Sequence, residues 1–195
     1  GEGTATTSGD VKIRSANSGT AGLSGALYFS SGTAKSSNSG AIYLGTGAAT
    51  SGRAGAVVVS VGSGTSGRGG LVHVSAGRST GVTGGAVRIM SGEGTATSSG
   101  VITIRSTNAG SSGASGALYF SSGTSSSGNS GSIFVGTGAR TDGRAGAVVL
   151  SVGSGTSGAG GLLQVFAGRS TVLTGGALTL SSGEGTASSS GAVTI

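Results

Sequence analysis

Pairs of apolar residues recur along the chain at a nearly constant interval, and each pair encloses one residue of a different kind. Each pair stands two and four residues after a glycine, which we call the anchor glycine. Val11 and Ile13 form the first pair around Lys12, and Leu27 and Phe29 form the next around Tyr28. Alternation with a period of two is typical of a strand that buries one face. The thirteen anchor glycines are Gly9, Gly25, Gly40, Gly55, Gly70, Gly85, Gly100, Gly116, Gly131, Gly146, Gly161, Gly176 and Gly191.

The anchor glycines define two nested periods. Successive anchors are 15 residues apart, except for two steps of 16. A longer period of 91 residues is visible in GEGTATTSG, GEGTATSSG and GEGTASSSG, which begin at residues 1, 92 and 183. The chain therefore contains super-repeats 1–91 and 92–182 and a partial third, 183–195, each full unit made of six short intervals.

A second glycine follows each anchor by about seven residues, as at Gly32 and Gly47. Glycine tolerates positive φ, so each of these positions is a candidate corner between two short strands. Stacked intervals would pair each strand with its equivalents above and below. We therefore predict an all-β fold, a parallel β-solenoid (β-helix) over residues 1–195, with about 15 residues and two short strands per coil and six coils in each 91-residue super-repeat.

Threonine recurs ten residues after most anchors, and stacking would place these threonines above one another. Residues two apart in a strand share a face, so we expect this threonine ladder to point inward against the apolar strand. Its members are Thr50, Thr65, Thr80, Thr95, Thr141, Thr156, Thr171 and Thr186. The same stacking would pair Arg78 with Glu93 and Arg169 with Glu184, because each acid follows its base by 15 residues.

Four aromatic residues are predicted to point outward. Tyr28 and Tyr43 occupy the middle position of neighbouring apolar pairs, and Tyr119 and Phe134 repeat them in the second unit. Such a patch can stack on sugar rings, meet a neighbouring rod, or serve no function beyond covering a sheet.

Composition restricts the alternatives. With 45 glycines, no proline and 8% charged residues, the chain has the composition of a flexible linker. The apolar residues of a linker, however, are not regularly spaced, whereas those of this chain are. No cysteine is present, which excludes disulfides. The net charge of +6 is dispersed without a basic run, which favours solubility or a weak affinity for glycans or anionic surfaces, and gives no indication of nucleic-acid binding. No apolar stretch approaches the ~20 residues of a membrane-spanning helix.

Candidate chemistry is sparse. Residues 62–67 fit G-x-G-x-x-G, but the following segment is another predicted strand, so we interpret the motif as a corner. His73 is the only histidine, and the glutamates Glu2, Glu93 and Glu184 lie 91 residues apart. No catalytic, metal or cofactor constellation converges, and we predict that the chain is not an enzyme.

The glycine rhythm and apolar pairs resemble those of β-solenoid proteins over all 195 residues. The Ser/Gly-rich style also resembles secreted repeat proteins of algae and related protists, which implies an extracellular or cell-surface location. Insect ice-binding solenoids use similar coils with Thr-x-Thr in each, whereas here that pair occurs only at Thr4/Thr6 and Thr95/Thr97.

The chain opens within an interval at Gly1 and ends on an apolar position, Ile195. Uncapped solenoid ends expose strand edges that pair with further copies. We therefore expect a structural protein, a stacked-coil subunit or segment of an extracellular fibre or filament, whose partners are copies of itself. The alternative is a module that binds ice, mineral or polysaccharide through a flat solenoid face.

Overall fold

The structure, a computed structural model, describes residues 8–195. Within that range no residue belongs to a helix or a strand. The prediction of a parallel β-solenoid is therefore wrong, and so are the strands and corners that it assigned to each coil. The chain divides into two units, Gly1–Ser99 and Gly100–Ile195, and the boundary falls at the anchor Gly100.

Hydrogen bonding and surface area both show the absence of a core. The chain exposes 19340 Å², whereas a compact protein of this mass exposes about 8,000 Å². A folded protein of this length makes on the order of one hydrogen bond per residue. The described residues make four backbone–backbone hydrogen bonds, and none of those residues is buried.

The described residues instead form loops. At the base of a loop two segments of the chain come close together, and we call this close approach a neck. At these necks the anchor glycine approaches a residue eight to ten positions earlier. A Cβ at Gly40 would lie 3.5 Å from the Cβ of Ser31, and one at Gly55 would lie 3.2 Å from the Cβ of Thr46. Backbone hydrogen bonds close other necks, as where the Gly85 N–H donates to the Gly77 carbonyl at 2.9 Å. We call the residues between the two sides of a neck a loop.

Each loop bends at its tip. The bends lie at residues 35–37, 50–52, 65–67, 80–82 and 95–97, and at 126–128, 141–143, 156–158, 171–173 and 186–188; turns take their place at 20–22 and 111–113, in the longer intervals. The chain thus bends three residues after the corner glycines expected at Gly32 and Gly47. Neither Gly32 nor Gly47 has a positive φ. Among the described residues only Gly143, in the bend 141–143, adopts one, with φ of 106°.

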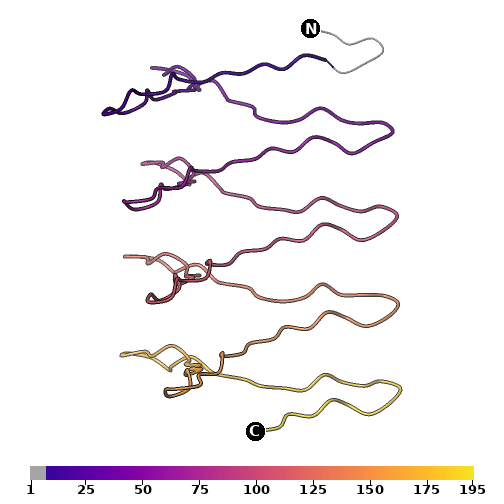
Figure 1. The fold of residues 1–195 in the computed structure, drawn as a ribbon. Helices are drawn as coiled ribbons and strands as arrows, with labels where there is room; N and C mark the ends of the chain where they lie inside the picture. Colours follow the sequence, from indigo (N-terminus) through magenta and orange to yellow (C-terminus); the bar gives the residue numbers. More distant parts are fainter. Residues whose placement is uncertain (1–7) are drawn as a thin grey trace. The chain divides into compact units, whose positions relative to one another are not determined.

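The loops of a unit do not stack on their neighbours along the chain. Figure 1 shows that the loops of unit Gly1–Ser99 extend partly to the left and partly to the right of the view, so positions one interval apart are not all superimposed. Energetics explain this. Each interval offers only two large apolar side chains for burial. Ordering the backbone of the interval carries a large entropic cost, which is greatest at glycine. The apolar pairs alone therefore do not offset the ordering of one isolated chain.

Candidate functional site

The apolar pairs retain their sidedness without a sheet. Tyr28 is 89% exposed, whereas its neighbours Leu27 and Phe29 are 48% and 66% exposed. The middle residue is likewise the most exposed of its three in the segments that follow Gly40, Gly55, Gly116, Gly131 and Gly146. Extended backbone places alternate side chains on opposite sides, which accounts for the pattern. We call the side formed by the second and fourth residues after each anchor the apolar face.

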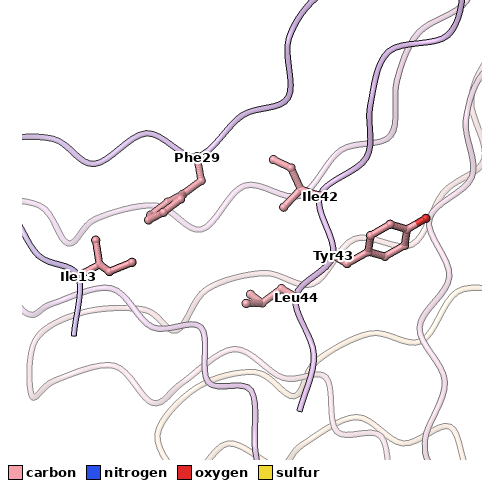
Figure 2. Close-up of a pocket in the computed structure, with 5 residues that line it drawn as sticks. All are labelled: Ile13, Phe29, Ile42, Tyr43 and Leu44. Carbon is pink, nitrogen blue, oxygen red and sulfur yellow. The ribbon is translucent and has the colours of Figure 1, made fainter. Parts of the chain in front are cut away.

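In unit Gly1–Ser99 the apolar face surrounds an open hollow of about 440 Å³, lined by Ile13, Phe29, Ile42, Tyr43 and Leu44. These residues come from three successive apolar segments. Figure 2 shows Ile42 and Leu44 directed toward Phe29 and Ile13, while the Tyr43 ring points away from them. All five side chains are more than half exposed. The hollow is therefore lined by apolar side chains and remains open to solvent.

The predicted threonine ladder is not packed inside. All eight of its threonines are exposed, and each is the first residue of a bend, as Thr50 is in 50–52 and Thr141 in 141–143. They lie at the tips of loops and do not pack against the apolar face.

The predicted charge pairs are not formed. Neither Arg78 with Glu93 nor Arg169 with Glu184 makes an ion pair in the described part of the chain. The ion pair present there joins Lys12 Nζ to Asp10 Oδ2 at 3.5 Å, between exposed side chains. The two members of each predicted pair belong to consecutive loops, and these do not stack.

The four aromatic residues Tyr28, Tyr43, Tyr119 and Phe134 are exposed, as are the apolar residues beside them. His73 is also exposed. Among residues 8–195 no group of three or more His, Cys, Asp or Glu side chains lies close enough to hold a metal ion.

The necks contain contacts that the β-solenoid prediction did not include. Thr46 Oγ1 donates to the Gly55 carbonyl at 3.2 Å, and Thr137 makes the equivalent bond to Gly146 at the same distance. A Cβ at Gly70 would collide with Cγ1 of Val61. The signal was available in the sequence, since these residues keep the same spacing in both 91-residue units.

Serine side chains support the loop tips. The Ser79 hydroxyl accepts from the Val82 N–H at 3.1 Å, and Ser170 accepts from the Leu173 N–H at 2.9 Å. Such hydroxyl-to-backbone bonds are typical of turns. They give a role to the serine that precedes Thr80 in the first unit and Thr171 in the second.

Comparison with known proteins adds no relative: no family model, no curated protein and no solved structure matches the chain. A search of residues 8–195 for a helix long and apolar enough to cross a membrane finds none. The candidate site therefore comprises two surfaces defined by the residues themselves, the apolar face and the exposed loops.

Proposed function

We propose that this chain is a repetitive structural segment of an extracellular fibre, in which copies of the chain cover one another's apolar faces. The observation that carries the proposal is the exposure of the apolar pairs: residues 8–195 contain no buried hydrophobic residue. A contiguous exposed apolar surface of more than a few hundred Å² is typical of an interaction site.

The energetics of one interval support association. Burial of both apolar side chains within one chain contributes less than ordering the interval costs. Contacts with other copies cover the apolar pairs that one chain leaves exposed, because each copy presents an identical set of apolar pairs. Association of this kind is the general solution for repeats that cannot bury their apolar face alone.

The repetition of the sequence supports a second copy as the partner. Val57 and Val59 in the first unit correspond to Val148 and Leu150 in the second, at the same distance from their anchor glycines. Two chains therefore present apolar pairs at matching intervals. Equal spacing allows many weak contacts to form in one register, which favours long assemblies over single dimers.

The extracellular location is part of the same proposal. It is supported by the resemblance to secreted Ser/Gly-rich repeat proteins. The low charged fraction of 8% suits a chain whose partners are copies with equally few charged residues.

Sedimentation velocity and electron microscopy of the full chain across the micromolar range test the proposal. We expect concentration-dependent growth into elongated particles. A chain that remains monomeric throughout that range would falsify the proposal. We do not propose the ice-binding or mineral-binding alternative, because it requires the flat face of a β-solenoid, and residues 8–195 contain no strand.

A further inference from the structure

Four consecutive loops of the first unit each carry one cationic side chain and no acidic one. The loops are residues 32–39, 47–54, 62–69 and 77–84, and we call them the cationic loops. Their cations are Lys35, Arg53, Arg68 and Arg78. No aspartate or glutamate occurs between Asp10 and Glu93, so no acid of the intervening sequence offsets this charge.

The four cations are exposed and unengaged within the described residues. Each is exposed to solvent, and no ion pair or side-chain hydrogen bond in residues 8–195 involves any of them. Lys12 provides the contrast, since its ammonium pairs with Asp10. The cationic loops therefore present positive charge that the chain itself does not neutralise.

We propose that the cationic loops bind a linear anionic polysaccharide. A guanidinium offers a planar fork of donors that matches a sulfate or carboxylate group. Single exposed contacts of this kind are weak, about 0.2–1 kcal/mol each. The four loops do not share one side of the unit (Figure 1), so one linear polymer engages their cations in turn along the chain, and the contributions accumulate through effective concentration.

The composition of these loops favours a polysaccharide over a nucleic acid. The cationic loops contain no aromatic residue, and therefore no platform on which bases stack. Nucleic acids also carry a dense charge, about one per 1.7 Å of duplex, which proteins match with clustered basic residues. Here one cation occurs per loop among glycine, serine and threonine, whose hydroxyl and backbone groups suit sugar hydroxyls.

The second unit provides an internal comparison. The positions of the four cations are occupied there by Ser126, Arg144, Ala159 and Arg169, so two of the four charges are missing. Arg140 and an acid, Asp142, also enter the loop that contains Arg144, so the four loops of the second unit carry three cations and one acid, against four cations and no acid in the first. The binding surface is therefore assigned to the first unit.

The test uses the full chain with heparin as the probe, measured by isothermal titration at several NaCl concentrations. The loop variant replaces all four cations by glutamine: K35Q, R53Q, R68Q and R78Q. We expect its affinity to fall by about tenfold to a hundredfold, the sum of four exposed contacts. The salt dependence should become shallower as well, because fewer counterions are released.

A matched control removes one lysine and three arginines outside the cationic loops: K12Q, R14Q, R88Q and R105Q. The two variants have the same net charge, so any difference between them reports position. We expect the control to lose about threefold or less. Equal losses in both variants would show that net charge alone governs binding, and would overturn the proposal.

Two further results would overturn it. One is the absence of heparin binding by the unsubstituted chain at low salt. The other is equally tight binding of a single-stranded oligonucleotide through the same four residues, which would assign the surface to nucleic acid. The inference does not rest on fibre formation, and sedimentation of the loop variant is measured in parallel. Loss of heparin binding without any loss of self-association separates the two proposals.

Discussion

Replacing one phenylalanine of the apolar face in each unit should weaken self-association sharply. The variant is Phe29→Ser with Phe120→Ser, which are equivalent positions and each 66% exposed. A phenylalanine buries about 150–250 Å² when covered, so about 100–165 Å² of this side chain is still available to a partner. At about 25 cal/mol per Å², covering it contributes roughly 2.5–4 kcal/mol for each phenylalanine. Serine forfeits most of that contribution.

Sedimentation velocity over a concentration series measures the effect. We expect the concentration at which association begins to rise by at least about tenfold, because 1.4 kcal/mol already corresponds to that factor. The control is Tyr28→Ser with Tyr119→Ser, which removes an aromatic of similar size from the opposite side. An equal shift in both variants would refute the assignment of association to the apolar face. No shift in the phenylalanine variant would refute the proposed function as well.

The remaining predictions concern the necks and the net charge. Gly70→Ala should open its neck, because the added Cβ collides with Cγ1 of Val61. NMR contacts between the Val61 methyl groups and residue 70 should then vanish. The control Gly62→Ala should retain these contacts, because a Cβ at Gly62 has nothing within 4 Å. Thr46→Val should shift the NMR carbonyl signal of Gly55 by removing its 3.2 Å hydrogen bond, with a stability change of at most about 0.5–1.5 kcal/mol; an unchanged signal would mean that the bond is absent in solution. Added NaCl should promote self-association, because it screens the repulsion between chains of charge +6 over a Debye length of about 10 Å at 0.1 M; dissociation of assemblies by salt would contradict this.

The sequence predicted the local features of the chain better than their assembly. The sidedness of Leu27, Tyr28 and Phe29 follows from alternation, because it depends only on extended backbone. The recurring bends follow from runs of small residues, although they lie three residues beyond glycines such as Gly32. These features are local, so a period in the sequence specifies them.

Stacking was not predictable from the same period. Pairing of Arg78 with Glu93 required consecutive loops to superimpose, and that required enough apolar burial to offset the ordering of the backbone. An interval with two large apolar residues and several glycines does not supply it. Periodicity shows which residues are equivalent. Whether equivalent residues come into contact depends on whether the free energy of apolar burial exceeds the entropic cost of ordering the backbone.

The necks explain how one repetitive chain presents two different surfaces. At the necks an anchor glycine lies close to an earlier residue, so closely at Gly70 that a side chain would collide there, and this approach separates a polar loop from an extended apolar segment. The apolar segment carries the pairs that we assign to contacts between copies, and the loop carries the cations that we assign to a polyanion. The two residue sets do not overlap: Phe29 belongs to the first and Arg53 to the second. Because bound polyanion would also lower the net charge that keeps copies apart, the two interactions should reinforce rather than displace each other.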